Sequence, residues 1–154
     1  MKIRGQRGFT FIELLTVLGI VAITCGFLLF VSIDTFHGTN FRSDRSVLVA
    51  ILQRARAQAM NNICAGVCIG GKTHGVHIDA RHYVLFQGDT YDPSDPQNAV
   101  FEASPGTSHS GVSDIVFSQL SATTSTVGDI TLTDREGHSS TITIGSQGQI
   151  AWSN

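Results

Sequence analysis

A chain of 154 residues has room for one modest domain with a single hydrophobic core, and no second domain is expected. Its formal net charge of −2 conceals an uneven distribution, because Lys2, Arg4 and Arg7 crowd the first eight positions. From Asn61 onward the chain holds three bases against nine acids. This acidic balance opposes broad binding to phosphate backbones, so nucleic acid is not an expected partner.

The segment 9–33 contains a run of 20 residues without a charged side chain, from Leu14 to Ile33. About 20 apolar residues suffice for a helix to cross the hydrocarbon core of a bilayer, so the sequence predicts a transmembrane helix. Because the three bases precede this run, the positive-inside rule places the N-terminus in the cytoplasm and the rest of the chain across the membrane. No A-x-A-like cleavage site is present, which disfavours an ordinary secretory signal peptide.

Two side chains are unusual within this predicted helix. Glu13 places a carboxylate near its start, and such a charge costs about 2.5 to 3.5 kcal/mol at the centre of a membrane span and less toward the interface. A group that neutralises Glu13 is therefore expected; the alternative is a carboxylate that reaches the aqueous interface from a plain anchor helix. Cys25 lies inside the apolar run, where packing against lipid or another helix is expected.

The N-terminal sequence RGFTFIELLTVLGIVAI resembles the class III signal of type IV prepilins. That signal is a basic leader ending in Gly, followed by an N-methylated Phe and by Glu as the fifth mature residue. The matching residues here are Gly8, Phe9 and Glu13. The resemblance implies that prepilin peptidase removes the leader 1–8 and that the α-amine of Phe9 is methylated. It also implies that Glu13 pairs with this amine on a neighbouring subunit, and opposite charges do satisfy each other where the dielectric constant is low.

The segment 34–62 has the pattern of an amphipathic helix. Apolar residues recur at three- and four-residue spacing between Leu48 and Ala59, opposite Arg45, Arg54 and Arg56. We expect this helix to continue from the membrane span and to cover a sheet with its apolar face.

The segment 63–154 changes to a period of two, with Gly, Asp and Pro between short apolar runs. The predicted fold class is therefore α+β, with a long N-terminal helix packed against a β-rich antiparallel head. Ile130, Leu132, Ile142 and Ile144 are expected on the inner face of one hairpin that turns at Asp134 to Gly137. The expected strands are Val67 to Ile69, Gly75 to Ile78, Tyr83 to Gln87, Ala99 to Glu102, Ile115 to Ser118, Ile130 to Thr133, Thr141 to Ile144, and Gln149 to Trp152. In the last of these, Ile150 and Trp152 are two positions apart and are expected on the buried face.

The C-terminal half, DIVFSQL followed by GDITLTDREGHSSTITIGSQGQI, resembles the GspH/FimT family of minor pilins and pseudopilins. The resemblance implies a pilin fold and a structural subunit, minor in its filament, of a type IV pilus or type II secretion pseudopilus. Its implied partners are other pilin subunits, prepilin peptidase and the inner-membrane assembly platform. The protein would be a single-pass protein of the cytoplasmic membrane with an extracytoplasmic head. Members of that family that bind DNA carry basic C-terminal tails, whereas this chain has no Lys or Arg after Arg135.

The alternative function is a membrane-anchored module on such a filament that captures DNA or adheres to a surface. An enzyme is not expected, because the chain contains neither G-x-S-x-G nor H-E-x-x-H and no other catalytic constellation. No cofactor is expected.

The residues Gly66, Gly71, Lys72 and Thr73 fit the phosphate-binding pattern G-x-x-x-x-G-K-[ST]. A functional loop of this type follows a strand and precedes a helix, so that the amides of the helix terminus meet the phosphates. Here a helical pattern precedes the segment and a strand pattern follows it. A glycine turn is therefore the expected structure, and nucleotide binding is not.

Cys64, Cys68, His74 and His77 have residue types that can ligate zinc. The two histidines are an odd number of positions apart in a predicted strand, so they point to opposite faces, which disfavours a shared metal. A disulfide between Cys64 and Cys68 requires a turn, since four residues of straight strand separate the Cα atoms by roughly 13 Å. The alternatives are two separate buried or free thiols.

Asp89, Asp92 and Asp95 lie in the loop GDTYDPSDP and offer oxygen ligands. Their spacing lacks the D-x-D-x-D-G pattern of a calcium loop, so a solvated turn with aspartate caps is expected. They remain a weak candidate for a metal site, and no metal is predicted.

Overall fold

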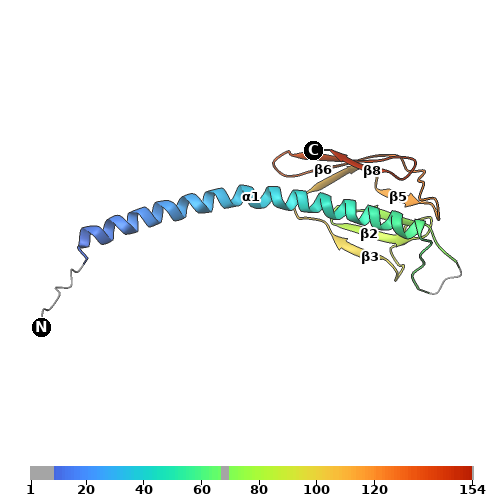
Figure 1. The fold of residues 1–154 in the computed structure, drawn as a ribbon, viewed down its shortest axis with the longest axis horizontal. Helices are drawn as coiled ribbons and strands as arrows, with labels where there is room; N and C mark the ends of the chain where they lie inside the picture. Colours follow the sequence, from blue (N-terminus) through green and yellow to red (C-terminus); the bar gives the residue numbers. More distant parts are fainter. Residues whose placement is uncertain (1–8, 67–69, 154) are drawn as a thin grey trace, which may run out of the picture. The chain divides into compact units, whose positions relative to one another are not determined.

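The structure is a computed structural model that describes residues 9–66 and 70–153, with the side chains of 28–39 outside the described set. A long helix, α1 (Phe11–Met60), leads into antiparallel strands (Figure 1). The chain divides into two compact units, Met1–Thr39 and Asn40–Asn154, and we call the second unit the head. The strands are β1 (His74–Ile78), β2 (His82–Gln87), β3 (Ala99–Glu102), β4 (Ser108–Gly111), β5 (Asp114–Phe117), β6 (Gly128–Thr133), β7 (Ser139–Ile144) and β8 (Ile150–Ser153).

The C-terminus of α1 is closed by backbone hydrogen bonds. The N–H of Ile63 donates to the carbonyl of Gln58 at 3.0 Å, and the N–H of Asn62 donates to that of Ala59 at 3.3 Å. Asn62 has a φ of 55°, and this left-handed residue with its two bonds forms a Schellman motif. The helix therefore stops at a defined position, and the chain turns back toward the sheets.

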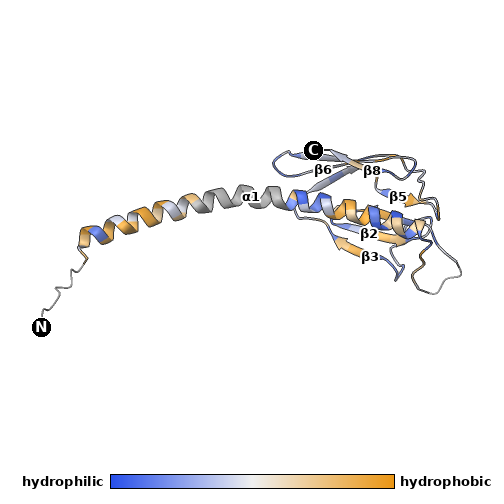
Figure 2. Ribbon diagram, in the orientation of Figure 1, coloured by the Kyte–Doolittle hydropathy of each residue, from blue (hydrophilic) through white to orange (hydrophobic). Residues whose placement is uncertain are grey.

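The strands form two antiparallel sheets in the head. Sheet A has the order β3-β2-β1-β5, and sheet B has the order β4-β6-β7-β8. The buried face of α1 and the inner faces of both sheets belong to one hydrophobic core, and Figure 2 shows apolar residues along these elements. The α1 residues in this core are Phe41, Leu48, Val49, Ile51, Leu52, Ala55 and Ala59.

The α+β fold class and most of the predicted strands are confirmed. In the hairpin of β6 and β7, Ile130 lies opposite Ile142, and both are fully buried with Leu132 and Ile144. The turn occurs where it was predicted, since the N–H of Asp134 donates to the carbonyl of His138 at 3.0 Å. Alternating side chains therefore determined this register, as expected for strands with one buried face.

Some expectations differ from the structure or lie outside it, and several strand ends, such as those of β6 and β8, differ by one or two residues. Strand β4 was not predicted, because SHSG is polar and this strand is an edge of sheet B. Strand β5 begins and ends one residue before the predicted Ile115 to Ser118. Trp152 was expected on the buried face of its strand but is 51% exposed, because β8 is the other edge of sheet B. The predicted strand Val67 to Ile69 falls outside the described residues.

We expect adjacent substitutions on β7 to differ sharply in their effect on stability. Ile142→Asn removes a fully buried apolar side chain and buries an amide, so it should lower the free energy of unfolding by about 3 to 5 kcal/mol. Thr143→Asn introduces the same residue on the exposed face, where an amide can still donate to Asp129, so its cost should stay below about 1 kcal/mol. Thermal melts of the full chain in detergent compare the two. Equal melting temperatures would show that the register is wrong.

Candidate functional site

The start of α1 contains the residues predicted to direct processing and assembly. Gly8 lies outside the described residues, and the described chain begins at Phe9, which is exposed. The backbone N–H of Glu13 donates to Oγ1 of Thr10 at 3.3 Å, with the Thr-x-x-Glu spacing of a capping box. A carboxylate in the first turn also interacts favourably with the helix dipole. Among the described residues no group pairs with the Glu13 carboxylate itself.

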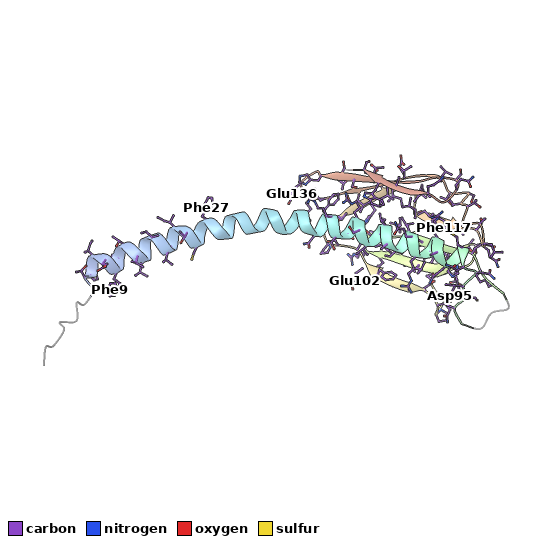
Figure 3. All side chains as sticks on the ribbon, viewed as in Figure 1. Phe9, Phe27, Asp95, Glu102, Phe117 and Glu136 are labelled. Carbon is purple, nitrogen blue, oxygen red and sulfur yellow. The ribbon has the colours of Figure 1, made fainter. Side chains whose placement is uncertain are left out.

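The described side chains from Phe9 to Phe27 are all exposed, although most are apolar (Figure 3). Phe9 and Ile23 expose 83% and 75% of their surface. A helix that is apolar on every side requires lipid or protein around it, because so large an apolar surface is unfavourable in water. This segment of α1 is therefore the largest candidate interaction surface in the described chain.

Within the described residues, none of the helices contains an apolar stretch long enough to cross a membrane. The predicted span from Leu14 to Ile33 includes residues 28–33, whose side chains lie outside the described set.

The cysteines and histidines do not form a described zinc site. Cys25 is an exposed free thiol, and Cys68 lies outside the described residues, so the disulfide between Cys64 and Cys68 stays a prediction. His74 is buried, its Nδ1 lies 3.1 Å from the carbonyl of Lys72, and burial lowers its pKa. His77 occupies the other face of β1, as its odd spacing from His74 predicted.

The segment from Gly66 to Thr73 does not have the architecture of a nucleotide-binding loop. Helix α1 ends before it at Met60, and strand β1 begins after it at His74. This order is the reverse of the strand-to-helix arrangement that presents helix amides to phosphates. Residues 67–69 of the segment lie outside the described chain.

The three aspartates of the loop between β2 and β3 each accept a hydrogen bond from a different group, and two of these bonds are local caps. Oδ1 of Asp92 accepts from the N–H of Ser94, and Oδ1 of Asp95 accepts from the N–H of Gln97, each at 2.8 Å. Oδ1 of Asp89 accepts from the hydroxyl of Thr73 at 2.8 Å. Each carboxylate thus has its own partner, and among the described residues the three do not converge on one point where a cation could bind.

A buried polar cluster joins α1 to both sheets, and sequence analysis missed it. The hydroxyl of Tyr83 on β2 donates to Oδ2 of Asp44 on α1 at 2.9 Å. Nε2 of His109 on β4 lies 2.5 Å from the same hydroxyl, and the N–H of Ser104 donates to Oδ1 of Asp44 at 2.9 Å. Because the Tyr83 proton is used toward Asp44, Nε2 of His109 must be the donor in their bond. Nδ1 of His109 is then buried without a partner in the described chain.

The electrostatics of this cluster favour ionised Asp44 and neutral Tyr83. Burial, together with the negative charge of Asp44, raises the pKa of Tyr83 far above its ordinary value. Burial by itself would raise the pKa of Asp44, but hydrogen bonds from His109, Ser104 and Tyr83 outweigh it and lower that pKa. The sequence contained one sign of this cluster. Asp44 lies four residues before Leu48, which places a carboxylate on the apolar stripe of the helix.

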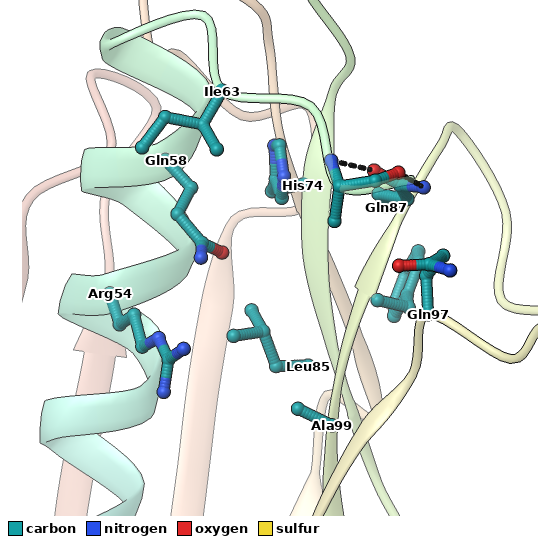
Figure 4. A pocket seen from close by; sticks show the side chains of 10 residues that line it. Arg54, Gln58, Ile63, His74, Leu85, Gln87, Gln97 and Ala99 are labelled. Carbon is teal, nitrogen blue, oxygen red and sulfur yellow. Dashed lines mark hydrogen bonds between the residues drawn. The ribbon is translucent and has the colours of Figure 1, made fainter. Parts of the chain in front are cut away.

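The cavities of the head differ in size and lining. The pocket in Figure 4, between α1 and sheet A, measures about 110 Å³ and includes Arg54, His74 and Leu85 in its lining. Gln87 closes it by exchanging two hydrogen bonds with the backbone of Ala65. Ligand pockets usually enclose about 300 to 1,000 Å³, so this one is too small for an organic ligand. A groove of about 560 Å³ is lined by the turn before β2 and the segment after β3.

Comparison with known proteins gives one match. Residues 3–29 match the family model described as the prokaryotic N-terminal methylation motif, which includes Gly8, Phe9 and Glu13. Neither the curated proteins nor the solved structures gave a match. The chain therefore carries a type IV pilin-like prepilin signal at its N-terminus, and proteins with this signal are processed and assembled with other pilin subunits.

The buried cluster predicts a loss of stability at alkaline pH. The pKa of Tyr83 is higher in the folded state than its ordinary value of 10.0. The contribution of Tyr83 to the free energy of unfolding is therefore complete below pH 10.0 and declines as the pH rises above that value. Tyr83→Phe should cost about 1 to 3 kcal/mol at neutral pH, since Asp44 loses a donor, and should flatten the alkaline decline. Chemical unfolding of the full chain between roughly pH 8 and 11 measures both. Tyr91→Phe is the control for loss of a phenol, and an equal alkaline slope in the two variants would contradict this account.

Proposed function

We propose that this chain is a minor structural subunit of a type IV pilus or a type II secretion pseudopilus. The observation that carries the proposal is the match of residues 3–29 to the methylation motif, on a segment whose apolar side chains have no cover within the described chain. Prepilin peptidase removes residues 1–8, and the mature subunit then begins at Phe9. The α-helix and antiparallel sheets of the head support a pilin-like fold. The assignment to the GspH/FimT group rests on the resemblance of the C-terminal half of the sequence.

The exposed apolar segment requires two successive environments. Before assembly the segment 9–33 spans the cytoplasmic membrane, with the N-terminus inside and the head outside. During assembly the same side chains leave lipid and pack against the equivalent helices of other subunits. Lipid chains and apolar side chains are similar environments for such a helix, so this transfer costs little free energy. Specific polar or charged pairs between subunits then determine the position of the subunit in the filament.

Glu13 is the specific pair that we propose for assembly. Its carboxylate has no partner among the described residues, while removal of the leader creates a positive α-amine at Phe9. Two such charges on neighbouring subunits neutralise each other in a medium where either one alone is costly. The capping bond that Glu13 makes uses only its backbone N–H, so its carboxylate is available for this pairing.

The alternative function of an anchored DNA-binding module has little support in the charge of the head. Within the head, ten acids oppose seven bases, and four of those bases are arginines of α1, so only Lys72, Arg81 and Arg135 follow the helix. A duplex contact that neutralises several phosphates requires more basic side chains on one face than this. The filament-subunit proposal is therefore preferred.

We expect cleavage after Gly8 to tolerate a small side chain and to reject a bulky one. Production with the cognate peptidase should yield a protein that lacks residues 1–8, with or without one added methyl group on Phe9. Gly8→Ala should remain mostly cleaved, whereas Gly8→Trp should remain full-length because the junction between leader and helix no longer fits the peptidase. Intact-mass analysis distinguishes these products, and complete cleavage of the Trp variant would refute the assignment.

Glu13→Gln separates the charge of this residue from its position in the helix cap. Gln is suited to the third helical position of a capping box, so the helix start should be preserved while the carboxylate is lost. Losing one partner of a pair in a low-dielectric medium costs roughly 3 to 5 kcal/mol, so incorporation into filaments should fall strongly at unchanged membrane levels. Thr10→Ala is the matched control, because it removes the cap at a cost of about 1 kcal/mol and keeps the charge. Wild-type filament recovery for Glu13→Gln would exclude the pairing.

A further inference from the structure

The groove of about 560 Å³ brings together two arginines that are far apart in the sequence. Arg81 is in the turn before β2, and Arg135 is in the turn between β6 and β7. The side chain of Arg135 lies over Gly106, where a Cβ atom would stand 3.1 Å from its Nε. His82 and Glu102 also line the groove, so its arginines outnumber its single carboxylate. Two of the three bases that follow Asn61 thus line one concave surface.

Neither guanidinium in this groove is neutralised inside the head. Among the described residues, the side chains of Arg81 and Arg135 have no carboxylate within 4.0 Å and no hydrogen-bond partner. Asp134, the neighbour of Arg135 in the sequence, pairs with His138 and not with an arginine. Paired guanidinium groups are the preferred protein ligand for carboxylate oxygens, because their donors match the planar acceptor.

The loop 88–98 between β2 and β3 has the opposite charge and is already ordered. It contains three aspartates and no base. The hydrogen bonds of Asp89, Asp92 and Asp95 use Oδ1, and no described group bonds to the Oδ2 atoms. The side chain of Asn98 donates to the carbonyl of Asp92 at 2.7 Å, and the ring of Tyr91 stacks on His77 at 4.2 Å. An ordered loop loses little conformational entropy when it binds.

The acidic loop and the groove lie at opposite ends of the same strands. Strand β2 begins at His82, which lines the groove, and ends at Gln87, directly before the loop. Six residues of strand extend over roughly 17 Å, so the two charged surfaces cannot meet within one head. Figure 3 shows the same separation, with Glu102 and Glu136 at one end of the head and Asp95 toward the other.

We propose that the acidic loop of one head docks into the arginine groove of the next copy of this chain. The free Oδ2 atoms of Asp92 and Asp95 accept hydrogen bonds from the guanidinium groups of Arg81 and Arg135 on the neighbour. The contact joins two different surfaces, so it is heterologous: a row of docked subunits keeps one free groove at one end and one free loop at the other. This repeat is what an open filament requires. The inference rests on the proposed function and adds to it a contact between heads, separate from the packing of the N-terminal helices.

Cysteine cross-linking between two versions of the full-length chain tests this contact. One version carries Thr107→Cys, on the groove lining, and the other carries Ser94→Cys, in the acidic loop; both carry Cys25→Ala. The two are produced together with the peptidase and assembly machinery, and cross-linked dimer is measured after mild oxidation. We expect a dimer that requires both introduced cysteines and decreases at high salt, because rim charges are screened.

Charge reversal then identifies the groups that make the contact. Arg81→Glu with Arg135→Glu in the groove version should reduce the dimer at least about fivefold, the ratio for a loss of about 1 kcal/mol. Asp92→Arg with Asp95→Arg in the loop version should restore it, which a merely unfolded variant would not allow. Lys72→Glu is the control, since it reverses a basic charge outside the groove and should not reduce the dimer, whereas Arg81→Glu or Arg135→Glu alone, with the same charge change, should reduce it.

The possible contrary results separate this inference from the proposed function. A dimer yield that charge reversal does not change, or a dimer that each single-cysteine version forms equally well, would overturn the docking of the loop. No dimer in any combination, with normal cleavage after Gly8 and normal filament incorporation, would overturn the head contact alone. Failure of cleavage and incorporation in the parent chain would overturn the proposed function, and the head contact with it.

Discussion

The head depends on one covering element, the apolar face of α1 between Phe41 and Ala59. Both sheets turn their inner faces toward the core that this stripe completes, so neither sheet could bury its Ile and Leu side chains without it. The one acid on the stripe, Asp44, is compatible with burial because Tyr83, Ser104 and the His109 region satisfy its carboxylate. The same bonds attach the helix to both sheets. Because hydrogen bonds are directional, they fix the orientation of α1 on the sheets, which non-directional burial of apolar area does not do.

The first half of α1 has the opposite property, because its apolar side chains have no cover within the described chain. The two units therefore differ: the head has a closed core, whereas the described apolar side chains of the first unit need cover from outside the described chain. A subunit with this division can leave a membrane and enter a filament without disturbing its head, since the core residues of the head are not the residues that change environment. The position of Glu13 also explains why its charge is tolerated, because a carboxylate in the first turn interacts favourably with the helix dipole. In the proposed filament it would gain a partner from a neighbouring subunit.

Elements with a regular spacing of apolar residues could be predicted from the sequence. Contacts between residues far apart in the chain could not, because they depend on how the strands and the helix pack. Helical spacing located the buried stripe of α1, and period-two alternation located β6 and β7 in the right register. The strand β4 escaped prediction because Ser108–Gly111 is polar and turns mainly His109 inward. Asp44 was visible as a charge on an apolar stripe, but its partner Tyr83 is 39 positions away. Arg81 and Arg135 likewise belong to turns of different hairpins, so their shared groove depends on how the sheets pack.

Accessibility of Cys25 tests most directly whether the exposed segment of α1 is covered by lipid and then by other subunits. This thiol is free and exposed in the isolated chain, in the middle of the apolar run. A variant in which Cys64 and Cys68 are replaced by Ser leaves it as the one thiol of the protein. The account predicts that a membrane-impermeant maleimide labels Cys25 in neither intact cells nor assembled filaments, and labels it once the chain is unfolded in denaturant. Rapid labelling of the mature, folded protein in intact cells or in filaments would contradict the account.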